Sequence, residues 1–391
     1  MNLNWIKEKV RFDRNEFSGA FGDIGTDLPL ILAMILSSQI NGASVFIVYG
    51  LMQLFTGFTY GIPMAVQPLK AVATIVIAGS IGGDVIFVGG FMIGVIMLVL
   101  TISGAIKWLG KIIPISVIRG VQLGLGITLA NIALKKYVLP DSEFIQYALV
   151  FVALVAGLIF IGNRKYPPAF FILGIGVIYS FVMHFDLTFS LFKEVSIQLP
   201  DFQIPNFELA ANAIILLALP QIPLSLGNSI FASHQLIKDL FPEKQVGINK
   251  ITYTYSFMNI FSPLLGGIPV CHGSGGLMGH YNFGGRTGGS VVIYGLFFII
   301  LGIFFATGIQ NFFYLIPLQI LGVILFFESI SLISIVFKDK YSKNEIFVVV
   351  FVGLAAFTLP YGFLISMILG TLIYYYFKKK KSESKEDVKC V

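Results

Sequence analysis

Long apolar runs separated by short polar loops dominate the chain from residue 17 to residue 377. A helix needs roughly 20 mostly apolar residues to cross the hydrocarbon core of a bilayer, and about twelve runs approach that length. The pattern therefore predicts an all-α polytopic membrane protein. The predicted full-length spans are 17–38, 43–60, 85–104, 112–133, 146–162, 167–184, 209–233, 246–262, 289–309, 315–337, 344–358 and 361–377.

Two segments framed by glycine and proline interrupt this pattern, 61–68 and 267–274. Each opens a stretch, 62–79 or 268–283, that is too short or too rich in glycine for an ordinary spanning helix. We predict a short extended strand followed by a half-helix in both. Non-helical backbone at membrane depth is tolerated only where it is buried in protein or lines a cavity, so the pair predicts a substrate site near the middle of the membrane.

An internal repeat relates the two interruptions. Gly61-Ile62-Pro63 recurs as Gly267-Ile268-Pro269, and the Ile-Pro pair at 113–114 recurs at 316–317. With the two half-helices the chain has about fourteen crossings, seven in each half, and an odd number inverts the second half relative to the first. We predict a first repeat at 17–184, an extracellular linker at 185–208 and a second repeat at 209–377.

Composition and charge support a membrane location. The mean hydropathy is +0.87, 56% of residues are hydrophobic and only 12% are charged, which excludes an ordinary soluble globular protein. Most of the 26 Lys and Arg residues fall in loops and at the ends, on alternate sides that place 1–16 and the basic tail 378–391 in the cytoplasm. We expect a multi-pass protein of the plasma membrane, with the lipid bilayer and no nucleic acid as partner, and a tail too short and polar to fold alone.

The two half-helix starts predict an anion site. A helix start presents unpaired backbone N–H groups and the positive end of its dipole. The first start adds the Gln67 amide and the Lys70 cation, and the second adds polar side chains and bare glycine backbone. An alternative is that these glycines only permit close helix packing. The predicted substrate-binding residues are Gln67, Lys70, His272, Gly273, Ser274, Gly275 and Gly276.

The first span carries Asp23, Thr26 and Asp27, with the two aspartates four residues apart and so on one helix face. Carboxylates at this depth cannot face lipid. Their burial and mutual repulsion favour protonation of one of them, which predicts a coupling site for H⁺ or another cation. The alternative is that one of them is a fixed partner for Lys70 or a cap for the backbone.

Further along the chain, Arg119 and Glu328 lie at similar depths on spans that the repeat makes equivalent. We predict a salt bridge between them, with a structural role or a role as a gate ion pair. The chain contains two cysteines, Cys271 and Cys390, which provide no disulfide framework, and we interpret Cys271 as a small core-filling residue.

Several kinds of chemistry are not indicated. The chain has no phosphate-binding loop of the G-x-x-x-x-G-K-[ST] type, so we expect no ATP hydrolysis. His272 and His280 lack a cysteine or carboxylate cluster that could complete a zinc site. We expect no enzyme activity, no cofactor and no bound metal.

Three motifs resemble the molybdate transporter family, a branch of the sulfate permease (SulP) superfamily. They are FGDIGTDLP at 21–29, IPMAVQPLKAVA at 62–73 and PVCHGSGGLMGHYNFGGRTGG at 269–289. The resemblance covers most of the chain and implies a seven-plus-seven inverted repeat, an anion held between the half-helix starts and an elevator-like motion of the core against the gate. It also implies a homodimer, and no C-terminal STAS domain is expected, as is usual in the molybdate branch.

The sequence thus predicts a secondary active transporter of a tetrahedral oxyanion, most of all molybdate and otherwise sulfate or tungstate, with H⁺ or Na⁺ as the coupling ion. Two alternatives remain open. A nucleobase permease of the same fold, for a uracil- or xanthine-type substrate, would use carboxylates and amides to read a neutral ring rather than Lys70 and bare glycine backbone. An uncoupled anion channel would not need Asp23.

Overall fold

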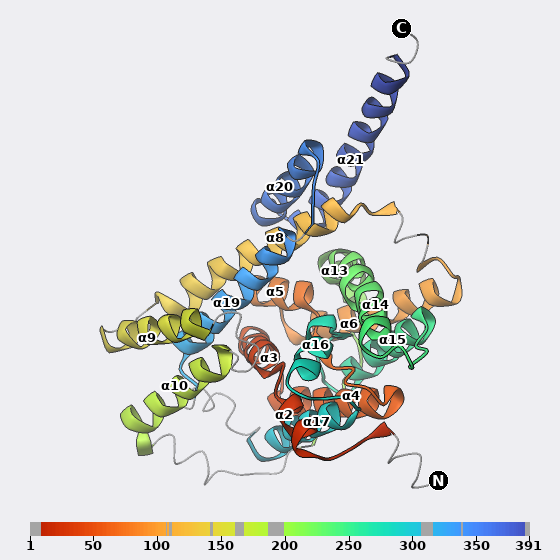
Figure 1. Cartoon of the computed structure of the whole chain (residues 1–391). Helices are drawn as coiled ribbons and strands as arrows, with labels where there is room; N and C mark the ends of the chain where they lie inside the picture. Colours follow the sequence, from red (N-terminus) through yellow and green to blue (C-terminus); the bar gives the residue numbers. More distant parts are fainter. Residues whose placement is uncertain are drawn as a thin grey trace.

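The computed structural model describes residues 9–106, 108, 112–140, 144–160, 168–186, 199–305, 316–337 and 339–387, and these are mostly helical (Figure 1). Residues 1–8 of the predicted N-terminal segment, residues 187–198 of the predicted linker 185–208 and the last four residues lie outside this part. The first half contains α2 (Arg14–Ala20), α3 (Ile24–Ser38), α4 (Gly42–Tyr60), β1 (Val66–Pro68), α5 (Lys70–Gly79), α6 (Gly83–Ile102), α8 (Ile115–Ile132), the π-helix η1 (Ala133–Val138), α9 (Phe144–Phe160) and α10 (Pro168–Met183).

The second half of the chain contributes the remaining described elements. It contains the 3₁₀-helix η2 (Phe207–Leu209), α12 (Ala210–Ala213), the π-helix η3 (Ile214–Ala218), α13 (Leu219–Leu224), the π-helix η4 (Ser225–Phe231), α14 (Ala232–Leu240), α15 (Ile248–Leu264), β2 (Val270–His272), α16 (Ser274–Asn282), α17 (Gly289–Phe305), α19 (Leu318–Val336), α20 (Lys343–Thr358) and α21 (Gly362–Asp387).

The prediction of a helical membrane protein is confirmed. Within the described residues, five helical segments are long and apolar enough to cross a membrane, or six when α2 and α3 count as one bent span. The five are α4, α6, α8 with η1, the run from η2 to α14, and α19; several further apolar helices are shorter than 18 residues. The number of about fourteen crossings therefore stays a prediction.

The first predicted span, 17–38, is broken rather than continuous. Helices α2 and α3 meet at an angle of 40°. Gly22 lies at the break, and a Cβ there would come within 2.6 Å of the Gly279 carbonyl group in α16. The absence of a side chain at Gly22 lets the two backbones approach each other, so the first span is broken where it passes α16.

The run 207–240 contains two π-helical segments, η3 and η4, on either side of α13. Helix α13 carries Pro220 and Pro223. Proline lacks the N–H for the helical hydrogen bond and clashes with the preceding turn, and the wider turns on both sides accommodate this without ending the helix.

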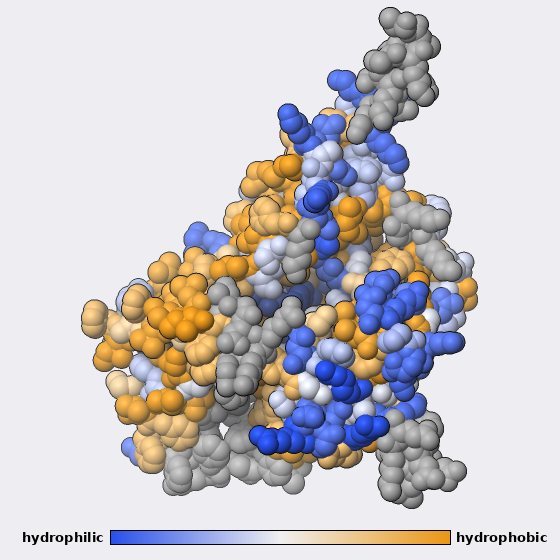
Figure 2. Space-filling model, viewed as in Figure 1, coloured by the Kyte–Doolittle hydropathy of each residue, from blue (hydrophilic) through white to orange (hydrophobic). Residues whose placement is uncertain are grey.

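The helices pack in two groups. In the first group α4 packs against α17 and α6 against α15, with α2, α3, α5, α12, α13, α14 and α16 around them. In the second group α8 packs against α19 and α20, together with α9, α10 and α21 (Figure 1). Figure 2 shows hydrophobic residues over α9 and α10 and hydrophilic residues over α2 and α14, with a hollow between the two groups.

The two short strands lie between the groups and pair with each other antiparallel. Gln67 is opposite Cys271, Val66 is opposite His272, and Pro68 is opposite Val270. Hydrogen bonds extend the pairing on both sides, from Leu69 N–H to the Pro269 carbonyl at 3.1 Å and from Gly273 N–H to the Ala65 carbonyl at 3.1 Å. The predicted extended segment is therefore present in both interruptions, and each strand leads directly into a short helix.

Both ends of the described chain are joined to neighbouring elements. Glu16 is buried and its carboxylate accepts from the backbone N–H groups of Arg286, Thr287 and Ser290 at 2.8–3.0 Å, so the described end of the N-terminal segment is attached to the first group. At the other end α21 continues to Asp387, through most of the tail 378–391. Lysine and glutamate favour helix, and a preceding helix supplies the nucleus.

Candidate substrate site

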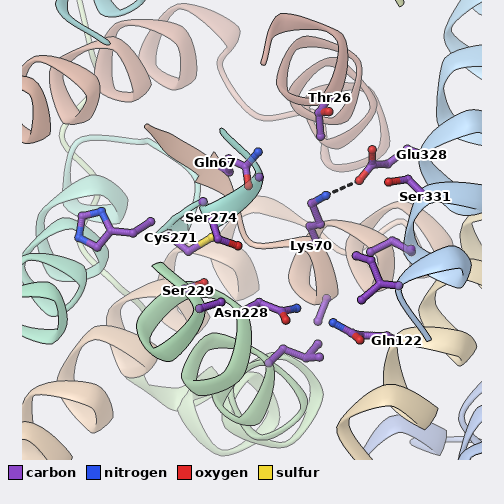
Figure 3. Close-up of a pocket in the computed structure, with 18 of the residues that line it drawn as sticks. Thr26, Gln67, Lys70, Gln122, Asn228, Ser229, Cys271, Ser274, Glu328 and Ser331 are labelled. Carbon is purple, nitrogen blue, oxygen red and sulfur yellow. Dashed lines mark hydrogen bonds and ion pairs between the residues drawn. The ribbon is translucent and has the colours of Figure 1, made fainter. Parts of the chain in front are cut away.

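A cavity of about 640 Å³ lies at the interface of the two groups and is lined by residues from both (Figure 3). The first group contributes the starts of α3, α5 and α16, the two strands and η4. The second group contributes α8 and α19. The charged residues of its lining are Asp23, Lys70, Arg119 and Glu328.

Gln67 and Cys271 form the central pair of the two strands, so their side chains lie on the same face, which is the face of the cavity (Figure 3). The Gln67 amide donates from Nε2 to Asp23 Oδ2 at 2.6 Å, which fixes its orientation. A Cβ on Gly273 would overlap the Gln67 side chain, so this glycine is required for the close approach. Cys271 is thus part of the cavity wall rather than only a core-filling residue.

Two buried amide side chains hold the strands in position. Gln53 of α4 donates from Nε2 to the Val66 carbonyl at 2.7 Å and accepts the Val66 N–H at 3.0 Å. Asn259 of α15 does the same for Val270, at 2.6 and 2.9 Å. A strand of three residues cannot satisfy its own backbone, and each amide replaces the missing neighbouring strand.

The two helix starts differ in how many backbone N–H groups they leave free. At the start of α5 the N–H groups of Ala71 and Val72 both donate to Gln221 Oε1, at 3.1 and 3.3 Å. At the start of α16 the N–H groups of Ser274 and Gly275 have no acceptor among the described residues. The start of α5 therefore offers fewer free N–H groups to an anion, because a glutamine from α13 already occupies that position.

Lys70 is the first residue of α5, and its ammonium group forms an ion pair with Glu328 Oε1 of α19 (Figure 3). The Lys70 side chain is 30% exposed to the cavity and the Glu328 side chain 10%. Arg119 instead donates from Nε to Asp339 Oδ2 at 2.6 Å and from Nη1 to Gln122 Oε1 at 2.9 Å.

The predicted salt bridge between Arg119 and Glu328 was therefore wrong. The sequence placed both residues at similar depths but could not show that Lys70, from the first group, reaches Glu328. The Asp339 carboxylate also lies close enough to satisfy Arg119 without Glu328.

Asp23 and Thr26 line the cavity, whereas Asp27 is fully buried outside its lining. Asp27 Oδ2 accepts from the hydroxyl groups of Tyr49 at 2.6 Å and Tyr294 at 3.2 Å. Asp23 precedes the first turn of α3 and accepts from Gln67, so neither aspartate pairs directly with Lys70 as the alternative interpretation had it.

Of the other predicted substrate-binding residues, only some face the cavity. His272 is at the cavity wall, but its ring bonds to Thr254 Oγ1 at 2.7 Å and packs edge-on against Tyr60, because the residue beside Cys271 in the strand faces the other side. Ser274 and Gly275 line the cavity, whereas Gly276 lies outside its lining and close to the Asp23 carboxylate.

Several polar residues of the cavity were not predicted, namely Gln122, Gln221, Asn228, Ser229 and Ser331 (Figure 3). Gln122 is 1% exposed and its Nε2 has no hydrogen-bond partner among the described residues. A buried donor without a partner is unfavourable, so it marks a position where an acceptor can bind. Glutamine within an apolar helix was the available signal for Gln122 and Gln221.

The family described as "Molybdate transporter of MFS superfamily" matches residues 15–129 and 213–332, which contain most of the cavity lining.

Three characterised relatives carry the same description in their names. Molybdate transporter 1 of Arabidopsis thaliana is 30% identical over 381 residues, covering 85% of this chain and 82% of the relative. Molybdate transporter 2 of the same plant is 30% identical over 402 residues, covering 88% and 84%. Molybdate transporter 1 of Chlamydomonas reinhardtii is 23% identical over 447 residues, covering 85% and 86%.

Solved structures share the fold at low sequence identity. The transmembrane domain of the cyanobacterial bicarbonate transporter BicA matches with a TM-score of 0.66 and 17% identity, covering 93% of this chain and 98% of that domain. The murine anion transporter Slc26a9 in its inward-facing state matches with a TM-score of 0.68 and 13% identity, covering 97% and 70%. The fold is thus the one shared by these transporters.

Proposed function

This chain belongs to the molybdate transporter family, and from that premise we propose that it is a secondary active transporter of a tetrahedral oxyanion, most of all molybdate and otherwise sulfate or tungstate. The resemblance that the motifs at 21–29, 62–73 and 269–289 indicated is confirmed by the family match. A transporter family rather than an enzyme family also agrees with the absence of catalytic motifs in the sequence.

One observation carries the proposal, namely that free donors and a cation from different elements converge on one cavity. The backbone N–H groups of Ser274 and Gly275 have no acceptor among the described residues, Gln122 has an unused amide N–H, and Lys70 extends into the same space. A tetrahedral oxyanion offers acceptor oxygens in several directions together with negative charge. A helix start, a lysine and an amide are the groups that recognise such a ligand.

We further propose a seven-plus-seven inverted repeat of about fourteen crossings, with the first helix group as the core and the second as the gate. The packing supports this. Helix α4 packs on α17, and its repeat equivalent α15 packs on the equivalent of α17, which is α6. The side-chain amides of Gln53 and Asn259 also hydrogen-bond to their strands in the same way. A cavity at the interface of two such groups suits elevator-like movement of the core along the gate.

Cation coupling, orientation and assembly complete the proposal. Asp23, Thr26 and Asp27 lie at or directly behind the cavity, where a bound H⁺ or Na⁺ offsets the charge of the anion. We place the protein in the plasma membrane with both termini in the cytoplasm, on the distribution of Lys and Arg, and propose that it forms a homodimer.

A competition experiment tests this function. Binding of molybdate to the purified protein is measured against tungstate, sulfate and uracil, at two pH values and with and without sodium. We expect the oxyanions to compete and uracil to have no effect. Binding of uracil alone would instead identify a nucleobase permease, and flux in proteoliposomes that ignores both pH and sodium gradients would identify an uncoupled channel.

A further inference from the structure

The ion pair between Lys70 and Glu328 joins the two helix groups across the proposed substrate site. Lys70 begins α5 in the first group and Glu328 lies in α19 of the second. The same ammonium group is the cation that the proposed function assigns to the oxyanion. The Glu328 carboxylate therefore occupies the position beside the Lys70 ammonium that the proposed function assigns to the oxyanion (Figure 3).

Both cations in the lining of the cavity already have a carboxylate partner. Its lining contains two cations, Lys70 and Arg119, and two carboxylic acids, Asp23 and Glu328. Arg119 is already bound to Asp339 outside the lining. A dianion that enters thus meets no cation that is free of a carboxylate partner among the lining residues.

We propose that the oxyanion displaces Glu328 from Lys70 and that the released Glu328 carboxylate takes up a proton, which makes Glu328 a proton-coupling group in addition to Asp23 and Asp27. This inference rests on the proposed function. Before the exchange, the Lys70 ammonium is paired with the Glu328 carboxylate, and the dianion and the proton are in solution. After it, the Lys70 ammonium is paired with the dianion, and Glu328 is a neutral carboxylic acid. No covalent bond within the protein changes except the new O–H, and the total charge is the same on both sides.

The surroundings of Glu328 explain why it takes up a proton when it loses Lys70. Its side chain is 10% exposed, and a charged carboxylate in such a place needs a partner. Helices α9 and α10, which pack against α19, carry no charged residue in their described ranges. The neutral acid removes the need for a partner.

The other charged groups on the neighbouring elements do not supply a replacement cation. On α8, Arg119 is held by Asp339 and Gln122. On η1, Lys136 donates to the Ile77 carbonyl at 3.0 Å at the far end of α5. On α3, Asp23 is itself an acid in the same cavity and supplies no cation.

The coupling follows from competition for one ammonium group. While Glu328 is ionised it holds Lys70 and binds the two helix groups together; once it is protonated, Lys70 is available to the anion and the bond between the groups is gone. Protonation of Glu328 therefore favours binding of the anion to Lys70, and binding of the anion favours protonation of Glu328.

The test is to count the protons that accompany binding. Molybdate is titrated calorimetrically into the purified full-length chain at neutral pH, in two buffers with different ionisation enthalpies. We expect the wild type to take up close to one proton per molybdate. Glu328→Gln is expected to bind molybdate at least as tightly, because the competing carboxylate is gone, and to take up one proton fewer. Glu208→Gln, an exposed glutamate outside the cavity, is the matched control and should behave like the wild type.

Three results would overturn the inference: binding by the wild type without proton uptake, unchanged uptake in Glu328→Gln, or no oxyanion binding by the wild type, which would remove the proposed function as well. The first two leave the proposed function intact and therefore separate the two ideas.

Should Glu328→Gln fail to fold, infrared difference spectra replace it. Addition of molybdate to the wild type is expected to produce the carbonyl band of a protonated carboxylic acid, and Glu328→Asp should shift its frequency. If this carbonyl band is absent, or if Glu328→Asp leaves its frequency unchanged, Glu328 is excluded as the group that takes up the proton.

Discussion

The unit formed by β1 and α5 and the unit formed by β2 and α16 have the same construction but offer different chemistry. Both consist of a three-residue strand held by a buried amide and followed by a short helix. The first unit presents side chains, Gln67 and Lys70, while Gln221 covers the N–H groups of its helix start. The second presents backbone, since the N–H groups of Ser274 and Gly275 are free in the described structure.

This difference suggests that the two units contribute different groups to anion binding. The first unit supplies the positive charge, and through Glu328 it is also the unit attached to the second helix group. The second supplies fixed donors whose direction does not depend on a flexible side chain. Charge gives attraction over a distance, and fixed donors give shape selectivity for a tetrahedral ligand.

The charge of the first unit is the strongest test of this difference. Lys70→Ala should weaken molybdate binding by about 30-fold or more, because loss of one partner of a buried charge pair costs roughly 2–5 kcal/mol. Equilibrium binding to the purified variant measures this. The single substitution also leaves Glu328 without its cation, so the double variant Lys70→Met with Glu328→Gln serves as the control. Wild-type affinity in this neutral double variant would refute the role of Lys70.

The backbone of the second unit is tested by two glycines that differ in their surroundings. A Cβ on Gly275 meets only Gln67 Nε2, at 3.9 Å, so Gly275→Ala should fold normally. If the anion approaches this backbone, the added methyl group occupies its space, and we expect about tenfold weaker binding, or roughly 1.4 kcal/mol. Gly82→Ala is a matched control, since nothing lies within 4 Å of that Cβ.

Gly273→Ala gives the contrasting result, since its methyl group overlaps the Gln67 side chain and has to displace it from Asp23. We expect this variant to lose thermal stability as well as binding. Unchanged affinity in Gly275→Ala, measured on the same scale, would show that the substrate does not contact the second unit there.

The sequence allowed the fold to be predicted because its signals are local. The length of apolar runs defines helices, and the recurrence of Gly61-Ile62-Pro63 at Gly267-Ile268-Pro269 identifies the two units. The same motifs pointed to Gln67, Lys70, Ser274 and Gly275, which line the cavity.

Partners that come from distant elements could not be predicted in this way. Glu328 is separated from Lys70 by most of the chain, so only the packing of α19 against the first group shows that they meet. The capping of α5 by Gln221 depends on the path of a run that two prolines and two π-helices reshape. Apolar periodicity contains no information about either contact.

The amides that hold the strands provide a test in which the two units should behave alike. Gln53→Leu and Asn259→Leu each leave the backbone N–H and carbonyl of a buried strand residue without partners, at a cost of roughly 1–3 kcal/mol for each unsatisfied group. Thermal unfolding of the purified variants should show similar losses. Gln235→Leu, at an exposed position, is the control. A loss in only one of the two variants would argue against equivalent units.

The smallest effect is expected at the second ion pair, which belongs to neither unit. Asp339 is 37% exposed at its side chain, and Arg119 keeps its bond to Gln122 when Asp339 is neutral. Solvent screens such a pair, so Asp339→Asn should change the free energy of unfolding by only about 0–1 kcal/mol. Its affinity for molybdate should stay near that of the wild type, because the cation proposed to bind the anion is Lys70. An effect on binding as large as that of Lys70→Ala would mean that Arg119 shares the anion, and the charge would then not belong to the first unit alone.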